Sequence, residues 1–396
     1  MQYRSVGENR ISALGFGCMR LPQNDRELCG RLIDRAIENG INYFDTAFMY
    51  SGNEALLGDL LKKHNRRDIY IATKLPPMVC FSGKDFEKVF RTELKRLQTD
   101  YVDFYLIHCL ADCDAWRRLC NMGIKEWIEQ KKKSGEIRNI GFSYHGGAPE
   151  FKKLIDDYSW DFTQLQFNYM DENAQAGREG VEYAAARGIP VIVMEPLRGG
   201  SLTYKLPQDA KDLLESRGMN AARLGLRWVL SHSEIACVLS GMNADEQLDE
   251  NLITACGAGT GCLSETELET VEEIKRILRA SSAVGCTGCG YCMPCPQGVA
   301  IPSCFEARNS FEANKANKKA FALNPARRQY MHATGILGNN PVNASKCVKC
   351  GLCEKKCPQH LEIRKHLEDT VKVLEPAWFM LPLRLFGKFN SRNTGK

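Results

Sequence analysis

Residues 69–108 read IYIATKLPPMVCFSGKDFEKVFRTELKRLQTDYVDFYLIH, a stretch in which one helix separates two strands. Ile69–Lys74 and Val102–His108 have the apolar, β-rich character of buried strands, and Asp85–Leu97 between them has a helical pattern. The same alternation continues on both sides, with further helix-like stretches at Glu27–Asn39 and Ile124–Lys133. The remaining strand-like runs are Leu14–Gly17, Asn42–Asp45, Ile137–Phe142, Phe162–Phe167, Val191–Met194 and Ala236–Ser240. Eight strand–helix units in about 250 residues predict an α/β fold, the (β/α)₈ TIM barrel.

A doubly wound open sheet is the competing fold. It would require a G-x-G-x-x-G turn after the first strand. Here the first strand runs into Gly15-Phe16-Gly17-Cys18-Met19-Arg20, which lacks that motif. Gly7-Glu8-Asn9 predicts the turn of a short hairpin ahead of the barrel. The barrel should therefore occupy residues 1–280.

The composition changes near residue 281, where ligand-like cysteines begin. Cys347-x₂-Cys350-x₂-Cys353-x₃-Cys357-Pro358 has the spacing of a bacterial ferredoxin run, which holds [4Fe-4S] clusters. A second run is Cys286-x₂-Cys289-x₂-Cys292-x₂-Cys295-Pro296, one residue shorter in its last gap. Zinc is the alternative metal for four cysteines.

Two runs that each end in Cys-Pro favour a pair of [4Fe-4S] clusters with crossed ligation. In a ferredoxin run the fourth cysteine ligates the other cluster. One cluster would then take Cys286, Cys289, Cys292 and Cys357, and the other Cys347, Cys350, Cys353 and Cys295. The wide, helix-rich separation of the runs predicts a small, mainly helical ferredoxin-type domain over 281–375, followed by a C-terminal tail, 376–396.

The number of cysteines and the distribution of charge indicate where the protein is located and which partners it could bind. Eighteen cysteines, with no signal peptide and no apolar run of membrane-spanning length, predict a reducing, cytoplasmic location. Residues 313–356 contain one acid, Glu354, and nine basic residues, at positions 315, 318, 319, 327, 328, 346, 349, 355 and 356. This excess either docks an acidic electron-transfer protein or compensates the charge of cluster thiolates. Nucleic-acid binding is not expected, because aromatic residues are not interleaved with these charges.

Within the barrel, four polar residues follow successive strands in a pattern that resembles the aldo-keto reductase family. Phe44-Asp45-Thr46-Ala47-Phe48-Met49-Tyr50 resembles that family's F-D-T-A-x-x-Y signature. Ile71-Ala72-Thr73-Lys74 looks like the strand that ends in its catalytic lysine, and Tyr105-Leu106-Ile107-His108 like the strand that ends in its catalytic histidine. The resemblance covers roughly 1–280, and extends to the iron–sulfur members of the family. It implies that Asp45, Tyr50, Lys74 and His108 are the catalytic residues for reduction of a small-molecule carbonyl substrate, with Tyr50 as the proton donor.

The resemblance also implies a nicotinamide cofactor site. Ser143 and Gln164 would hold the carboxamide, Met194 would stand at the stacking position, and Leu197 and Arg198 would line the phosphate side. After Ser240, Asn243 and Glu246 should cap a helix whose N-terminus binds phosphate, and Glu250 and Asn251 match the family's adenine-side pair. Gly241 and Gln247 stand where the family has the basic residues that bind the 2′-phosphate of NADP. Either NADP or NAD could therefore be the cofactor.

The fusion leaves three functions to distinguish. Hydride transfer moves two electrons together and clusters move one, so a converter such as a flavin is expected when the two are joined. The chain could be a nicotinamide-dependent reductase with attached clusters, or an enzyme whose nucleotide site holds a flavin that exchanges electrons with the clusters. The third possibility is a nucleotide-sensing redox binding module without turnover.

Overall fold

The computed structural model of the chain describes residues 1–313, 325–336, 341–378 and 380. Packing divides these residues into two units. The first comprises Met1–Thr203 with Leu214–Val271, and the second comprises Tyr204–Leu213 with the described part of Glu272–Lys396. The expected domain boundary at 280/281 falls at the end of helix α11, Glu265–Ser281.

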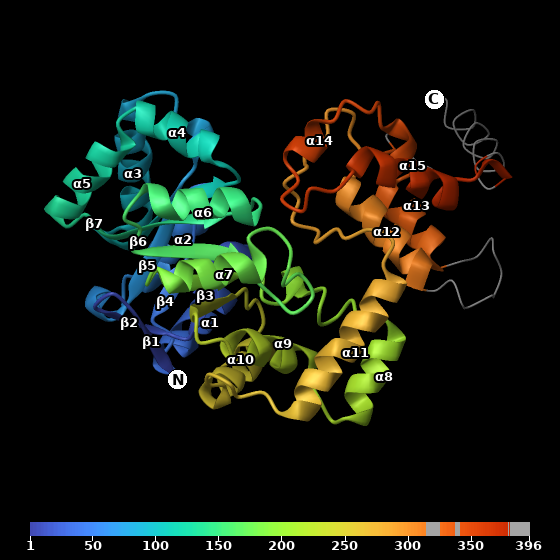
Figure 1. The fold of residues 1–396 in the computed structure, drawn as a ribbon, viewed down its shortest axis with the longest axis horizontal. Helices are drawn as coiled ribbons and strands as arrows, with labels where there is room; N and C mark the ends of the chain where they lie inside the picture. Colours follow the sequence, from blue (N-terminus) through green and yellow to red (C-terminus); the bar gives the residue numbers. More distant parts are fainter. Residues whose placement is uncertain (314–324, 337–340, 379, 381–396) are drawn as a thin grey trace. The chain divides into compact units, whose positions relative to one another are not determined.

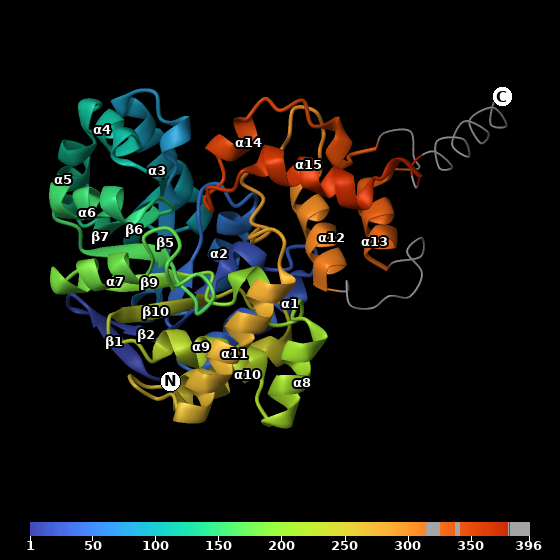
Figure 2. The ribbon, with the colours of Figure 1, turned by 45° about the vertical axis from the view of Figure 1, so that its right-hand side comes forward.

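The first unit is a closed barrel of eight parallel strands in the order β10-β3-β4-β5-β6-β7-β8-β9. Figures 1 and 2 show these strands inside the unit, with helices outside them. The strands are β3 (Leu14–Gly17), β4 (Tyr43–Asp45), β5 (Tyr70–Leu75), β6 (Val102–Leu110), β7 (Ile137–Tyr144), β8 (Phe162–Gln166), β9 (Val191–Met194) and β10 (Ile235–Ser240). Each overlaps a predicted run, so the TIM barrel is confirmed.

Amphipathic helices cover the outside of the strands. Helix α3 is typical: Ser82 and Asp85 form a capping box at its start, and Phe86, Phe90 and Leu94 are buried. The other helices of this unit are α1 (Arg26–Glu38), α2 (Asn53–Leu61), α4 (Cys113–Asn121), α5 (Ile124–Ser134), α6 (Ala148–Asp157), α7 (Gly177–Ala186), α9 (Ala221–Leu230) and α10 (Asp245–Gly257). Helix α3 itself spans Gly83–Leu97, whereas α8, Gln208–Ser216, contains the point at which the chain returns from the second unit to the first.

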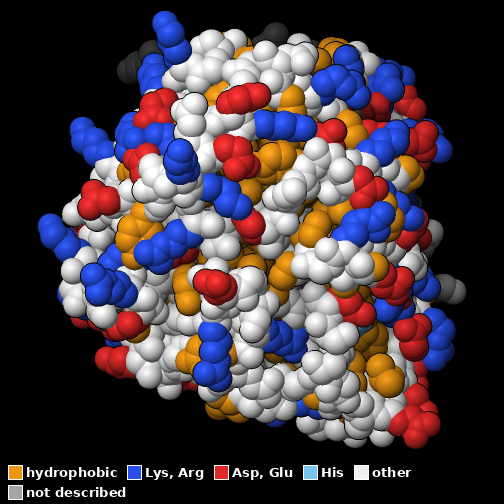
Figure 3. All heavy atoms as spheres, turned by 60° about the vertical axis from the view of Figure 1, so that its left-hand side comes forward, with side chains coloured by type: hydrophobic (Ala, Val, Ile, Leu, Met, Phe, Trp, Pro, Cys, Tyr) orange, Lys and Arg blue, Asp and Glu red, His pale blue; other side chains and the backbone are white. Residues whose placement is uncertain are grey.

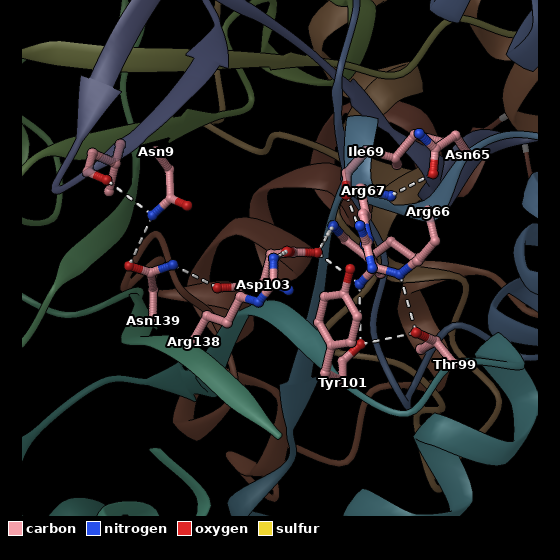
Figure 4. Close-up of polar contacts among 12 residues, drawn as sticks. Asn9, Asn65, Arg66, Arg67, Ile69, Thr99, Tyr101, Asp103, Arg138 and Asn139 are labelled. Atoms are coloured by element: carbon pink, nitrogen blue, oxygen red, sulfur yellow. Dashed lines mark hydrogen bonds and ion pairs between the residues drawn. The ribbon is translucent and has the colours of Figure 1, made fainter. Parts of the chain in front are cut away.

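A polar cluster closes the end of the barrel where the strands begin (Figure 4). The predicted hairpin, β1 (Tyr3–Val6) with β2 (Asn9–Ser12), reaches it through Asn9, whose amide donates to Asn139 Oδ1 at 3.2 Å. Asp103 is fully buried and accepts hydrogen bonds from Arg66 at 2.7 Å and Arg138 at 3.0 Å. At this face of a TIM barrel, such a network contributes to stability and leaves the opposite face for chemistry.

The second unit is mainly helical. Its helices are α12 (Ile301–Ala313), α13 (Pro325–Thr334), α14 (Leu352–Lys355) and α15 (Ile363–Leu374). Its apolar core includes Phe305, Tyr330 and Leu367. The phenol of Tyr330 and the amide of Asn343 both donate to the buried carboxylate of Glu375, which ties α13, α15 and the segment before Cys347 together. Most of the predicted tail, 376–396, lies outside the described residues.

Charge is distributed in pairs over the surface. Basic and acidic side chains are interspersed on the face drawn in Figure 3. Neighbouring helices pair them, as in Lys152 with Glu179 at 2.6 Å and Arg187 with Asp156 at 2.5 Å. Within the described residues, no helix combines the length and apolar character needed to cross a bilayer.

Candidate active site and cluster-binding cavities

A buried ion pair lies at the carboxyl ends of β4 and β5. The Lys74 ammonium donates to both Asp45 carboxylate oxygens at 2.7 Å and to the Thr46 carbonyl at 2.6 Å. Lys74 is 1% exposed and Asp45 4% exposed. Burial raises the pKa of Asp45, and the adjacent ammonium opposes the rise. The contact of the Lys74 ammonium with both oxygens therefore favours the charged form of Asp45.

Tyr50 and His108 lie beside this pair. The Lys74 Nζ is 5.3 Å from the centre of the Tyr50 ring, and the Tyr50 and His108 ring centres are 6.0 Å apart at 84°. His108 is buried at the end of β6. Burial, and then the charge of Lys74, lowers the pKa of His108 well below its ordinary value. The structure thus brings the four predicted side chains together, with the imidazole neutral.

The loop that carries Tyr50 is held by its neighbour Asn53. The Asn53 backbone N–H donates to the Tyr50 carbonyl at 3.0 Å. Its side chain accepts from Thr46 Oγ1 at 2.7 Å and donates to the Cys18 carbonyl at 2.6 Å. Asn53 was not among the predicted site residues, although its position three residues after Tyr50, at the start of α2, was a usable signal.

The predicted carboxamide-binding residues are neighbours across two strands. Ser143 on β7 is paired in register with Gln164 on β8. Ser143 Oγ accepts from the Cys109 N–H at 2.8 Å, and the Gln164 amide donates to Met194 Sδ at 3.7 Å. Gln164 Oε1 is buried and has no hydrogen-bond partner in the described chain. A buried acceptor in this state fits a ligand that offers an N–H donor, as a nicotinamide carboxamide does.

The predicted phosphate-side and adenine-side residues have mixed surroundings. Arg198, in a tight turn after β9, lies 3.1 Å from Asp171 Oδ2, so an acid already faces its charge. Leu197 precedes that turn. Ser240 at the end of β10 accepts a hydrogen bond from Asn251 at 2.8 Å, and Glu250 is half-buried beside it in sequence on α10. Asn251, on helix α10, therefore braces the end of β10.

The start of α10 differs from the prediction. The helix begins at Asp245 with Ala244 as its N-cap, so the expected capping box of Asn243 and Glu246 is wrong. Asn243 lies outside the helix, and its N–H donates to Gln247 Oε1 at 3.0 Å. Asp245 and Glu246 lie in its first turn, where acids interact favourably with the helix dipole.

Gly241, which stands where the family has a cation, lies beneath an arginine from the turn after β3. A Cβ added at Gly241 would be 3.2 Å from Arg20 Cδ, so the Arg20 side chain crosses this glycine. Arg20 ends the short turn after β3, and β3 neighbours β10 in the barrel. Sequence reasoning missed Arg20, because only barrel closure brings the first and last strands together.

In the second unit, two cavities draw cysteines from both runs. The first cavity is lined by Cys286, Cys289, Cys292 and Cys357. The second is lined by Cys295, Cys347, Cys350 and Cys353, with Cys292 also at its edge. These are the two sets expected from crossed ligation. Four thiols around one small volume fit a [4Fe-4S] cluster, in which each thiolate binds a different iron atom.

Comparisons with known proteins agree with the barrel and with the cysteine-containing unit that follows it. The aldo/keto reductase family model matches residues 13–276, and the 4Fe-4S dicluster domain model matches residues 285–363. The chain is 27% identical over 314 residues to L-galactose dehydrogenase of Arabidopsis thaliana, covering 69% of this chain and 96% of that protein. It is 26% identical to the NADH-specific methylglyoxal reductase of Escherichia coli, over 61% of this chain and 86% of that protein.

Among solved structures, the chain is similar to an aldo-keto reductase of Bacillus halodurans in its holo form. The TM-score is 0.58 at 27% identity, and the match covers 69% of this chain and 96% of that chain. The chain is also similar in fold to an aldo/keto reductase of Klebsiella pneumoniae in complex with NADP and acetate, with 21% identity and a TM-score of 0.57. At this identity the likeness supports the fold alone.

Proposed function

Because this chain belongs to the aldo/keto reductase family and carries a 4Fe-4S dicluster domain after its barrel, we propose that it is an NAD(P)H-linked carbonyl reductase with two [4Fe-4S] clusters. The observation that carries the proposal is the Lys74–Asp45 pair, buried beside Tyr50 and a neutral His108. We assign the barrel domain to 1–280, the ferredoxin-type domain to 281–375 and the tail to 376–396, and we expect a cytoplasmic location.

Each residue of the site has a distinct role in this reaction. A bound nicotinamide supplies the hydride that is added to the carbonyl carbon. Tyr50 donates a proton to the carbonyl oxygen, and Lys74 favours this by stabilising the phenolate that remains. Asp45 keeps Lys74 charged and in place through its two 2.7 Å contacts. Neutral His108 donates a hydrogen bond to the same oxygen and orients the substrate.

Fewer contacts support the proposed binding site for the nicotinamide cofactor. Gln164 Oε1 would accept a hydrogen bond from the carboxamide of a bound nicotinamide, next to Ser143 and Met194. Leu197, Arg198 and the start of α10 would hold the phosphates of that cofactor. The absence of the family's cations at Gly241 and Gln247 leaves NAD as plausible a cofactor as NADP. A flavin in the same site is the alternative, because one-electron clusters joined to hydride chemistry require a converter.

The clusters serve electron transfer in this proposal. The crossed sets of cysteines hold them, and an acidic electron-transfer protein exchanges single electrons with them. Alternatively, the protein could be a nucleotide-sensing redox module, in which case the site binds cofactor without turnover.

The test combines cofactor extraction with one substitution. Protein purified without oxygen should contain about eight irons per chain, and the extracted cofactor identifies nicotinamide or flavin by mass and spectrum. Tyr50→Phe should lower NAD(P)H-linked carbonyl turnover by about 10²–10⁴-fold while cofactor affinity is unchanged. The matched control is Tyr204→Phe, at an exposed tyrosine of the second unit. Unchanged turnover in Tyr50→Phe would refute the proton-donor role, and zinc in place of iron would refute the clusters.

A further inference from the structure

The two cysteine-lined cavities of the second unit differ in charge. The cavity of Cys286, Cys289, Cys292 and Cys357 has no charged residue in its lining, and residues 282–300 contain no Lys, Arg, Asp or Glu. The cavity of Cys295, Cys347, Cys350 and Cys353 is lined also by Lys356 and Arg364. Any charge-dependent recognition of the clusters should therefore take place at the second cavity.

Ion pairing leaves a net positive surface beside that second cavity. Arg364 is paired with Glu354 at 2.7 Å, and Lys349 is paired with Glu368. Lys346, Lys355 and Lys356 are exposed and make no ion pair within the described chain. The uncompensated charges around this cavity are thus all positive, and they flank Cys347 and Cys353 in sequence.

The same surface exposes apolar side chains close to a ligand cysteine. Val348 is 61% exposed and Leu352 46% exposed, and both line the second cavity. Cys350, between them in sequence, is the one cysteine of the eight that is classed as exposed. An apolar centre with a charged rim is the usual composition of a docking site between two proteins.

Two other basic residues of the segment 313–356 are compensated or buried, Lys349 by its pairing with Glu368 and Arg327 by packing. Arg327 is 2% exposed, donates to the Val373 carbonyl at 2.8 Å and lies over the Phe311 ring, so it belongs to the core. Positions 315, 318 and 319 lie outside the described residues. The three exposed lysines without an ion pair in the described part of this segment, Lys346, Lys355 and Lys356, thus lie within or next to the Cys347–Cys357 run.

We propose that Lys346, Lys355, Lys356, Val348 and Leu352 form the docking surface for a small acidic one-electron carrier protein, and that electrons enter or leave through the cluster beneath it. This inference rests on the proposed function, since it takes the cavities to hold [4Fe-4S] clusters. The step transfers one electron: the reduced carrier is oxidised, the oxidised cluster is reduced, and no bond or proton changes. The uncharged cavity then holds the inner cluster, one step farther from the carrier.

The test measures binding of the iron-loaded protein, not its turnover. The probes are an acidic bacterial two-cluster ferredoxin and basic cytochrome c. Wild-type protein should bind the ferredoxin and not the cytochrome, with a dissociation constant that rises steeply with ionic strength. The triple variant Lys346→Glu, Lys355→Glu, Lys356→Glu should raise that constant by about tenfold or more at low salt. Val348→Ser with Leu352→Ser should weaken binding and leave the salt dependence unchanged.

The control reverses an equal number of exposed barrel lysines, Lys62, Lys84 and Lys88. It should change the constant by less than about twofold, because none of these three lysines belongs to the proposed docking surface. Iron content and the visible spectrum show whether each variant keeps its clusters, and the single variant Lys355→Glu replaces the triple one if that protein loses iron. Equal weakening by the barrel control, or wild-type binding that prefers cytochrome c, would overturn the proposal. Failure of carbonyl turnover would refute the proposed reaction and leave this binding result intact.

Discussion

The barrel and the cluster-binding unit hold their reactive side chains in different ways. In the barrel, Asp45, Lys74 and His108 are at or near the ends of hydrogen-bonded strands, and each is at most 5% exposed. In the second unit, most of the cysteines lie in turns and loops, several are half-exposed, and Gly288, Gly290 and Gly351 take left-handed backbone conformations beside them. The barrel site is therefore organised by the protein itself, whereas the cysteine loops depend on what they bind.

The largest expected effect tests how far the barrel site is organised by its own ion pair. Lys74→Met leaves the buried Asp45 carboxylate without its cation, which should destabilise the barrel by about 3–5 kcal/mol and lower turnover by at least about 10²-fold. Denaturant unfolding and steady-state assays measure the two effects. Adding Asp45→Asn should restore most of the stability and none of the turnover. The exposed Lys62→Met serves as the control, with a change within about 0.5 kcal/mol.

The next effect tests crossed ligation in the cluster unit. Cys357→Ser and Cys286→Ser should each disturb the same cluster, so both variants should lose up to about four of eight irons and leave the same residual spectrum. Cys295→Ser and Cys347→Ser should share the other residual spectrum. If instead Cys357→Ser matches Cys347→Ser, each run holds its own cluster. Cys256→Ser, at an exposed cysteine outside both cavities, should retain all the iron.

A smaller effect concerns a pair of buried acids behind the barrel strands. Thr73 Oγ1 donates to Glu54 at 2.6 Å, and the Tyr105 hydroxyl donates to Glu93 at 2.6 Å. Burial, and then the charge of Glu54, raises the pKa of Glu93 well above its ordinary value. Folding thus favours protonated Glu93, and this contribution is lost as pH rises from the unfolded pKa, about 4.3, through the folded pKa.

Glu93→Gln should therefore gain stability relative to wild type as pH rises above about 4.3, by up to about 1.4 kcal/mol per pH unit until Glu93 ionises in the folded protein. Unfolding free energies of both proteins at a series of pH values measure the difference. The exposed Glu269→Gln provides the comparison without burial. A difference that is constant with pH would contradict the buried-proton assignment.

The smallest expected effect is an absence of pH dependence. Since burial and Lys74 lower the pKa of His108 well below its ordinary value, its titration should not shape turnover between about pH 6 and 8, where a free histidine near 6.5 would titrate. A pH profile of kcat/KM checks this. A step near pH 6.5 that disappears in His108→Gln would show that the imidazole is accessible to protons.

Local sequence predicted most of the barrel and less of its cofactor side. The eight strands and the residues after β4, β5 and β6 follow from periodicity and motif, because each depends on residues near in sequence. Arg20 over Gly241 depends on β3 closing against β10, and Asn243, the predicted cap of α10, lies outside the helix with its N–H bonded to Gln247. The buried pair of Glu54 and Glu93 behind β5 was not predicted, because the two residues come from separate helices and meet only in the packed structure.

The sharing of cysteines between the two cavities has a consequence for biogenesis. Each cavity takes thiols from both the 286–295 run and the 347–357 run, so one cysteine set is complete only after synthesis through Cys353 and the other only after Cys357. All of the barrel strands precede Cys286 and can fold before that point. Iron insertion should therefore be the last stage of maturation, and a chain interrupted between the runs would carry a folded barrel with unfilled, oxidation-prone thiols.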